Sequence, residues 1–208
     1  MTESVPRGVV EAADIVAVSQ LLLRERFGRD LGLWEQMRDC YHDDSIVRIS
    51  WMKGSGPEFV RHSKEMVERG VQANHRLGPI LVTLAGDRAI GQFTGTIDIP
   101  SALKGIDVIM SSDARFLVRA ERRAGPWRIS GFDIVYLRDK VTPVIPGQVL
   151  AIDPEAVTAF RPSYRFMSYS LTLSGFPVPN DLPGIDRPDL VDVLVREVYG
   201  WAGLAVAC

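Results

Sequence analysis

The chain has few cysteines, no long apolar run and little net charge. Its 208 residues include only Cys40 and Cys208, and its formal net charge is −2. Two cysteines do not make a disulfide framework, and Cys40, among apolar and aromatic neighbours, is predicted to be a small buried hydrophobe. No segment approaches the roughly 18–20 apolar residues of a transmembrane helix, and the N-terminus lacks a signal-peptide pattern. We therefore expect a cytoplasmic protein with no membrane partner and no nucleic-acid partner.

Several cofactor-binding motifs are missing as well. The chain has no glycine-rich dinucleotide fingerprint, no phosphate-binding loop, no His-Glu-x-x-His and no Cys-x-x-Cys pair. The run His42-Asp43-Asp44 offers possible metal ligands, but adjacent residues rarely converge on one ion, and a turn before a strand explains them better. We therefore predict no metal site and no cofactor.

The pattern of apolar residues predicts three helices followed by a sheet. A helix is expected from Val9 to about Phe27. Its buried stripe is predicted to carry Val16, Leu23 and Phe27, widened by Ile15, Val18 and Leu22, and would reach Asp30 if continued. A short helix near Trp34 and a third helix from Pro57 follow. Strands are expected over residues 46–51, 80–84, 89–99, 106–122 and 127–137, with turns at 85–87 and 124–126. This order predicts an α+β fold in which a curved antiparallel sheet wraps around the helices.

The last third of the chain differs in character. Prolines divide residues 141–208 into short pieces, and helices are predicted only near 162–174 and 188–201. We therefore predict a core domain over residues 1–140 and a C-terminal helical extension over 141–208 that packs on it. The extension is expected to act as a lid or as an arm that holds a second subunit, and the plainer alternative is a packed tail.

His75 is the most informative polar residue, because it stands where helical periodicity changes to strand periodicity. A neutral imidazole can accept a proton near pH 7, and a buried carboxylate on its other nitrogen would fix the tautomer. Asp30, at the end of the first predicted helix, is the candidate carboxylate. A histidine at such a junction can equally be a structural residue, so the pattern alone does not decide.

Several short motifs resemble those of the nuclear transport factor 2-like superfamily, and within it the SnoaL-like group with scytalone dehydratase and lindane dehydrochlorinase. The motifs are Leu22-Leu-Arg-Glu-Arg-Phe27, Arg29-Asp30-Leu-Gly-Leu-Trp34, Cys40-Tyr-His-Asp-Asp-Ser45, Arg48-Ile-Ser-Trp51, Asn74-His75, Ala85-Gly-Asp-Arg-Ala89 and Trp127-Arg-Ile-Ser130. The resemblance covers about residues 10–140. It implies a cone-shaped α+β barrel and a catalytic dyad of Asp30 and His75.

The chain also departs from the patterns of those enzymes. Glu25 stands where the dehydrochlorinase pattern has a lysine, and Phe132 falls near its last-strand arginine. The dehydratase pattern uses tyrosines to polarise a substrate carbonyl, and Tyr41 is the nearest candidate here. We therefore expect His75, Asp30 and Tyr41 to be the catalytic residues.

The resemblance places a substrate cavity between the helices and the concave face of the sheet, and strand alternation suggests its lining. One parity places inward Ser50, Met52, Met110, Ser112, Ser130, Phe132 and Ile134. The other parity places inward Ser111, Asp113, Arg115, Gly131 and Asp133. The first set, with Trp51, makes an apolar pocket for an aromatic or polycyclic substrate, so the predicted substrate-binding residues are Trp51, Met52, Met110, Ser112, Ser130 and Phe132.

Two classes of function remain open at this point. The first is a cofactor-independent lyase of the dehydratase or carbon–carbon cleaving type that acts on a small hydrophobic, hydroxylated substrate, with an isomerase or cyclase as a variant. The second is a non-catalytic ligand-binding or assembly module. Contact of Asp30 with His75 at about 3 Å beside an open cavity would favour the enzyme, and a filled cone would favour the binding module. A homodimer or higher homo-oligomer is expected for this fold.

Overall fold

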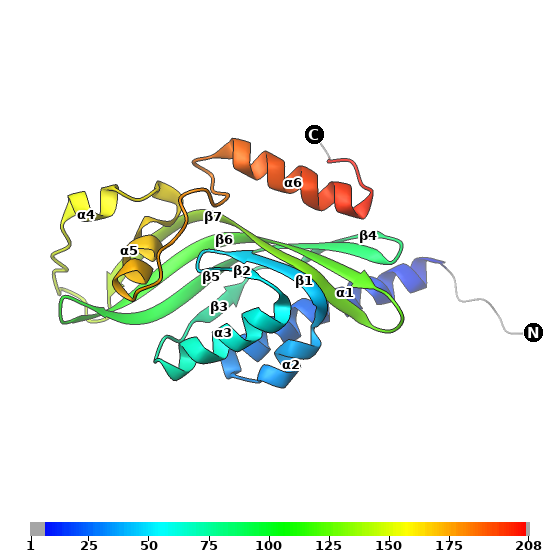
Figure 1. Cartoon of the computed structure of the whole chain (residues 1–208), viewed down its shortest axis with the longest axis horizontal. Coiled ribbons are helices and arrows are strands. Elements are labelled where there is room, and N and C mark those ends of the chain that lie inside the picture. The colour runs from blue at the N-terminus through cyan, green and yellow to red at the C-terminus, as the bar shows by residue number, and fades with distance from the viewer. Residues whose placement is uncertain (1–6, 207–208) are drawn as a thin grey trace, which may run out of the picture.

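Seven strands form one curved sheet in the order β2-β1-β7-β6-β5-β3, with β4 also paired to β5 (Figure 1). The computed structural model describes residues 7–206. The strands are β1 (Tyr41–Ile49), β2 (Met52–Gly54), β3 (Asn74–Leu77), β4 (Leu81–Ala85), β5 (Arg88–Leu103), β6 (Ile106–Arg122) and β7 (Trp127–Pro143). The pairs are antiparallel except that β1 runs parallel to β7. The predicted antiparallel sheet therefore has one parallel pairing.

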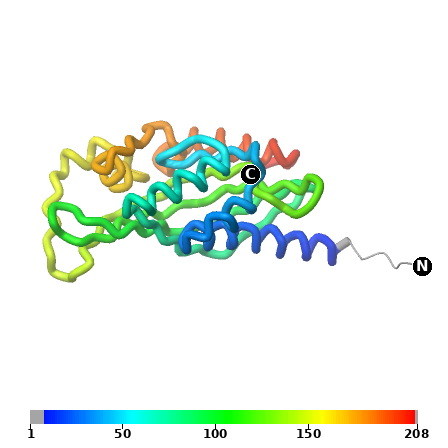
Figure 2. The backbone as a smooth tube through the Cα atoms, turned by 60° about the horizontal axis from the view of Figure 1, so that its bottom comes forward, coloured from blue at the N-terminus to red at the C-terminus, as the bar shows by residue number. Residues whose placement is uncertain are grey.

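Helices cover both faces of this sheet. They are α1 (Arg7–Leu31), α2 (Trp34–Asp39), α3 (Gly56–Glu68), α4 (Pro154–Thr158), α5 (Arg165–Leu173) and α6 (Pro188–Ala202), with a 3-10 turn η1 (Pro162–Tyr164) before α5. Helices α1, α2 and α3 lie on the concave face, and α6 lies on the opposite face (Figure 1, Figure 2). The predicted fold, with three N-terminal helices packed in a curved sheet and a helical C-terminal extension, is confirmed.

Strand alternation separates two hydrophobic cores. On β7, Phe132, Ile134 and Tyr136 join the main core with α1, α3 and α5. Between them, Val135 packs with Leu194 and other residues of α6 in a second core. The first of the two predicted parities is therefore the one that faces inward on β7. Val135 and its neighbours form an outer layer because α6 covers the face that would otherwise be exposed.

Ser130 is an exception to this alternation, and its prediction as a lining residue is wrong. Arg119 pairs with Gly131 and Ala120 pairs with Ile129, so Ser130 is the extra residue of a β-bulge. A bulge shifts the alternation of side chains by one residue. Ile129 accordingly joins the main core, and Ser130 donates its hydroxyl proton to the carbonyl oxygen of Arg119.

Local sequence signals explain where α3 begins and where the chain turns from β5 into β6. Ser55 caps α3 in a capping box with Glu58, and a proline occupies the first turn. A two-residue turn joins β5 to β6, and both Lys104 and Gly105 have positive φ angles, 52° and 77°. This is the geometry that matches the twist of a hairpin. The long β5–β6 hairpin therefore has its register fixed at the turn.

Helix α1 buries only part of the stripe that its apolar residues predict. Val18 and Leu22 are buried as predicted, but Ile15, Val16 and Phe27 are 41%, 60% and 57% exposed, so the prediction is wrong for these three. The buried face continues from Val18 and Leu22 through residues that were not predicted: Leu21, Glu25, Arg26 and Arg29. Its C-terminal half is charged, which conceals it from a search for apolar periodicity.

The C-terminal extension adds to the main core through α5. Strand β7 continues past the predicted boundary at residue 140 and ends at Pro143. One carboxylate oxygen of Asp139 on β7 accepts a hydrogen bond of 2.7 Å from the backbone N–H of Met167, which holds the first turn of α5. The division into residues 1–140 and 141–208 stays a prediction.

Cys208 lies outside the described residues, and no helix within residues 7–206 has the length and apolar character to cross a membrane.

Candidate functional site

Asp30 and His75 meet in the structure although 45 residues separate them. Nδ1 of His75 lies 2.6 Å from Oδ1 of Asp30, and the backbone N–H of His75 donates to Oδ2 at 2.7 Å. Asp30 stands in the last turn of α1, and His75 lies in β3. A carboxylate at a helix C-terminus is unfavourable for the helix dipole, so these two hydrogen bonds compensate for its position. The predicted contact between the two residues is therefore present.

This contact defines which nitrogen of His75 is available for chemistry. An ionised carboxylate can only accept hydrogen bonds, so Nδ1 carries the proton, and the unprotonated Nε2 accepts a hydrogen bond of 3.3 Å from Nη1 of Arg26. Burial lowers the pKa of His75 below its usual 6.5, and the charges of Arg26 and Arg29 lower it further, against the opposing effect of Asp30. Burial raises the pKa of Asp30, but its bonds to His75 outweigh burial and lower it. The pair is thus a neutral imidazole and a carboxylate near pH 7.

Arg26 lies next to Nε2, the unprotonated nitrogen of the His75 imidazole. Its Nη1 is 3.3 Å from Nε2 of His75, and its Nε and Nη2 donate to the adjacent carboxylate of Glu25. Both side chains are buried, with 4% and 1% exposed. Burial disfavours the Arg26 cation, but the charge of Glu25 outweighs this, and the pKa of Arg26 is raised. A permanent positive charge therefore stands beside the atom that would accept a proton.

Tyr41 belongs to this charged cluster and not to the cavity wall. Its hydroxyl donates to Oε1 of Glu25 at 2.8 Å, and its side chain is fully buried. Burial and the charge of Glu25 raise the pKa of Tyr41 well above 10.0. Tyr41 is not among the residues that line the cavity beside His75. The geometry does not support its predicted role toward a substrate carbonyl, because its hydroxyl proton is used to hold Glu25.

A small cavity lies beside His75. Its volume is about 50 Å³, which is room for roughly one or two water molecules. The polar side chains on its wall are Arg26, Arg29, Ser50, His75 and Tyr136, and the remaining lining is Ile49, Trp51, Phe59, Met66, Val71, Ala73, Ile97, Ile99, Ile134, Met167 and Leu171. The last two belong to α5, so the C-terminal extension closes one side of the cavity.

Of the predicted substrate-binding residues, only Trp51 lines this cavity. Phe132 is on the correct face, but its ring packs under Arg26, whose guanidinium carbon is 4.7 Å from the ring centroid. Met110 and Ser112 are buried on β6, where Ser112 pairs with Asp139 near α5. Met52 lines the neighbouring groove. Phe132, Met110 and Ser112 therefore fill the core and do not line the cavity.

Arg26, Arg29 and the lining residues of α5 were not among the site residues predicted from the sequence. Residues 18, 22, 25, 26 and 29 continue one face of a helix at steps of three and four. The charges of Glu25, Arg26 and Arg29 on that face are the signal that identifies a polar wall. No comparable signal exists for Met167 and Leu171, because their position depends on how the extension folds back.

A larger groove adjoins the cavity. It has a volume of about 490 Å³ and lies between β1, β7, α6 and the segment 177–183. It shares five lining residues with the cavity: Ile49, Ser50, Trp51, Ile134 and Tyr136. A volume of this size is in the range of small-ligand sites. The shared residues separate the small cavity beside His75 from a wide groove whose wall also carries charged residues, among them Arg48, Asp133 and Glu197.

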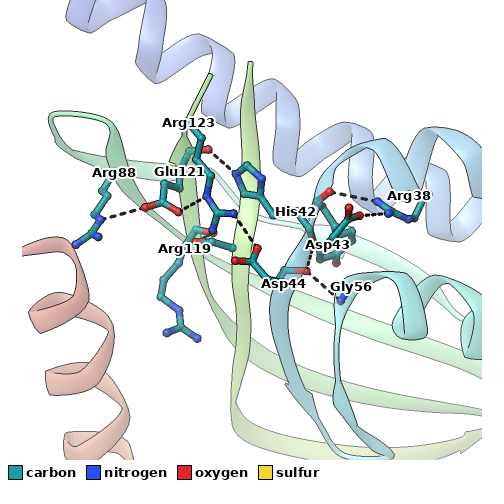
Figure 3. A network of polar contacts seen from close by, with 12 residues as sticks. Arg38, His42, Asp43, Asp44, Gly56, Arg88, Arg119, Glu121 and Arg123 are labelled. Carbon is teal, nitrogen blue, oxygen red and sulfur yellow. Dashed lines mark hydrogen bonds and ion pairs between the residues drawn. The ribbon is translucent and has the colours of Figure 1, made fainter. Parts of the chain in front are cut away.

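The second histidine of interest, His42, lies in a network of surface contacts (Figure 3). Nε2 of His42 contacts the carbonyl oxygen of Glu121 at 3.0 Å. Asp43 pairs with Arg38, and Asp44 pairs with Arg123. The run His42-Asp43-Asp44 is part of strand β1 and not the predicted turn. Within residues 7–206, no group of three or more His, Cys, Asp or Glu side chains is placed to hold a metal ion.

Comparison with known proteins identifies the fold family. A model of the SnoaL-like domain matches residues 10–133. The chain belongs to the SnoaL-like family. Pea pathogenicity protein 2 of Fusarium vanettenii is 27% identical over 183 residues, which cover 84% of this SnoaL-like chain and 78% of that protein.

Two solved structures share the fold at low identity. Hexachlorocyclohexane dehydrochlorinase (LinA) type 2 superposes with a TM-score of 0.56 at 17% identity, covering 71% of this chain and 98% of that chain. A putative scytalone dehydratase from Novosphingobium aromaticivorans superposes with a TM-score of 0.52 at 13% identity, covering 69% of this chain and 94% of that chain. The resemblance that the sequence motifs indicated is therefore confirmed for the family and the fold.

Proposed function

We propose that this SnoaL-like protein is a cofactor-independent lyase of the dehydratase type, acting on a small, largely hydrophobic, hydroxylated substrate. The observation that carries the proposal is the 2.6 Å contact between Asp30 and Nδ1 of His75 at the wall of a cavity. This contact leaves a neutral, buried Nε2 as the base. Structural neighbours named as a dehydrochlorinase and a dehydratase add support, because both names describe eliminations.

The chemical step uses only groups of this chain. Nε2 of His75 removes a proton from a substrate carbon, and the electron pair of that C–H bond forms a carbon–carbon double bond. The neighbouring carbon–oxygen bond breaks, and the departing hydroxide takes the proton from the imidazolium and leaves as water. Asp30 holds the ring and stabilises the imidazolium while it exists.

Arg26 is suited to stabilise negative charge in the same step. Its Nη1 stands 3.3 Å from Nε2, so an anion that forms next to the transferred proton lies near this cation. Electrostatic stabilisation by a fixed charge is effective in a dry, buried site. Arg26 therefore replaces, in this proposal, the tyrosines and the last-strand arginine of the related patterns.

A non-catalytic ligand-binding or assembly module is the second candidate, and the small size of the cavity favours its assembly form. A volume of about 50 Å³ is below the roughly 300–1,000 Å³ of typical small-molecule sites. Met167 and Leu171 of α5 form part of the wall, so displacement of α5 would enlarge the space. The lyase proposal therefore requires α5 to move when a substrate larger than a few atoms enters.

The test is turnover of hydroxylated aromatic and alicyclic compounds by wild type and by the variants His75→Ala and Asp30→Asn. We expect each variant to lower the rate by about 10²–10⁴, which is the usual contribution of a general base. His62→Ala is the matched control, because His62 is 39% exposed and pairs with Glu65 at the surface. Binding without turnover in wild type would favour the module, and equal rates in His75→Ala would exclude the dyad.

A homodimer or higher oligomer and a cytoplasmic location remain predictions from the sequence. Light scattering during gel filtration measures the mass of the particle directly. A mass near twice 23.1 kDa would support the dimer, and a mass near 23.1 kDa would contradict it.

A further inference from the structure

One buried charge beside the dyad is not used by the proposed chemistry. The side chain of Arg29 lies one helical turn after Arg26 on α1, is 4% exposed and lines the cavity. Within residues 7–206, its Nη1 is buried and has no hydrogen-bond partner. A buried guanidinium donor without an acceptor is costly, so an acceptor brought by a ligand would remove this cost.

The neighbouring carboxylates are engaged elsewhere. Oδ1 and Oδ2 of Asp30 accept from the ring and the backbone of His75, and both oxygens of Glu25 accept from Arg26. The guanidinium of Arg29 instead stands near the ring of Trp34, with its central carbon 6.0 Å from the ring centroid. Burial and the charge of Arg26 lower the pKa of Arg29 to about 10, which still leaves it charged near pH 7.

We infer that Arg29 binds an anionic group of the ligand, most simply a carboxylate. This inference rests on the proposed function, because it assigns the substrate class of the same cavity. A carboxylate is planar and singly charged, and it matches the two-pronged donor edge of a guanidinium. As in the lyase proposal, α5 must move before a carboxylate with an apolar body can enter the cavity of about 50 Å³.

The rest of the cavity describes the other end of such a ligand. Val71, Ala73, Ile97 and Ile99 line it together with Met66 and Leu171. An apolar or aromatic body would pack against them while the carboxylate faces Arg29. The expected substrate is thus a small amphiphilic hydroxy acid whose carboxylate is permanent, and not only an anion that forms during the reaction.

A bound carboxylate would also change the pKa of His75. Arg26 and Arg29 both lower the pKa of His75, so a carboxylate that offsets their charge raises it. The ligand would therefore make His75 a stronger base when it binds. A nuclear magnetic resonance titration of His75 with and without a bound carboxylate measures this shift.

The test compares matched charged and neutral probes on the full-length chain at constant ionic strength. Propionate and benzoate are titrated against propionamide and benzamide by calorimetry, in wild type, Arg29→Gln and Arg29→Lys. We expect the acids to bind wild type at least about tenfold more tightly than the amides. Arg29→Gln is expected to lose that preference, and Arg29→Lys to keep part of it. Arg24→Gln is the control, because Arg24 is exposed on the same helix, and it should bind as wild type does.

Stability provides a second readout. Because wild type buries a guanidinium donor without an acceptor, Arg29→Gln is expected to melt at a higher temperature than wild type when no ligand is present. Saturating benzoate should raise the melting temperature of wild type and leave that of Arg29→Gln unchanged.

Failure of this inference differs from failure of the lyase proposal. Equal affinity of wild type and Arg29→Gln for the acids, or no binding of either acid, would overturn the carboxylate site. Arg29-dependent binding that persists in His75→Ala, with no turnover by wild type, would keep the site and remove the lyase.

Discussion

The backbone N–H and the ring Nδ1 of His75 are both bound by the one carboxylate of Asp30, at 2.7 and 2.6 Å. The bond to the backbone N–H fixes the position of the strand, and the bond to Nδ1 fixes the orientation of the imidazole ring. The end of α1 and the start of β3 are thereby held together at the site. A substitution of Asp30 consequently affects both the orientation and the charge of the base.

The pH dependence of the reaction should reflect the lowered pKa of His75. The base works only when neutral, so the rate falls as pH drops through its pKa, which burial sets below 6.5. We expect kcat/KM to be constant from about pH 8 to below pH 6.5 and then to fall with a slope of one proton. Asp30→Asn removes an interaction that raises this pKa, so the fall should occur at still lower pH. A profile that already falls above pH 6.5 in wild type would contradict this assignment.

Tyr41→Phe separates a structural from a catalytic role for this tyrosine. The change removes the 2.8 Å hydrogen bond to Glu25 and leaves a buried carboxylate oxygen short of a donor. We expect the free energy of unfolding to fall by about 1–3 kcal/mol, with kcat changed less than about threefold, a factor equivalent to less than 1 kcal/mol in the barrier. Urea unfolding and steady-state kinetics on the same preparation measure the two quantities. A large loss of kcat at unchanged stability would restore the role predicted from the sequence.

Shortening the side chain of Leu171 on α5 should widen the range of ligands that the cavity accepts. Leu171 is 5% exposed and lines the cavity, so Leu171→Ala is expected to lower the free energy of unfolding by about 2–5 kcal/mol. It should also raise the affinity for 2-naphthol relative to phenol, because the added volume lies on the apolar wall. Leu173→Ala, at a position 62% exposed on the same helix, is expected to change neither. An unchanged affinity ratio in Leu171→Ala would show that α5 does not limit ligand size.

Asp139, which contacts α5, should make the free energy of unfolding depend on pH. Burial raises the pKa of Asp139 from 3.8 to about 6, despite the backbone N–H groups of α5 that oppose it. For a group whose pKa is higher in the folded state, the stabilising contribution is complete below pH 3.8 and is lost as pH rises through about 6. We expect the free energy of unfolding of Asp139→Asn to decline less than that of wild type between these pH values. Identical pH dependence in urea titrations of the two proteins would contradict this.

The fold was predictable because its signals are local and apolar. The change from a period of 3.6 to a period of 2 near His75 located the boundary between the helices and the sheet. The turn predicted at 85–87 and Pro57 at the start of α3 located two more boundaries. The parallel pairing of β1 with β7 was not predictable, since it joins strands about 85 residues apart and depends on tertiary packing.

The site was predictable only in part, for reasons that particular residues make clear. Asp30 and His75 were found through residue chemistry and family resemblance, which do not require knowledge of the lining. Arg26 and Arg29 were missed because the exposed apolar side chains of Val16 and Phe27 suggested the wrong face of α1. Ser130 was misplaced because a β-bulge leaves no mark in the alternation of residue types.

The arginines on the cavity wall, Arg26 and Arg29, come from the C-terminal part of α1, whereas much of the apolar wall comes from α3, β5 and α5. Ile97 on β5 pairs directly with His75, but α5 belongs to a separate, C-terminal part of the chain. Substitutions on α5 would therefore alter the shape of the accepted molecule while the proton-transfer residues on α1 and β3 stay in place. Such a division suits a scaffold for directed evolution, in which new substrates are sought without rebuilding the reactive groups.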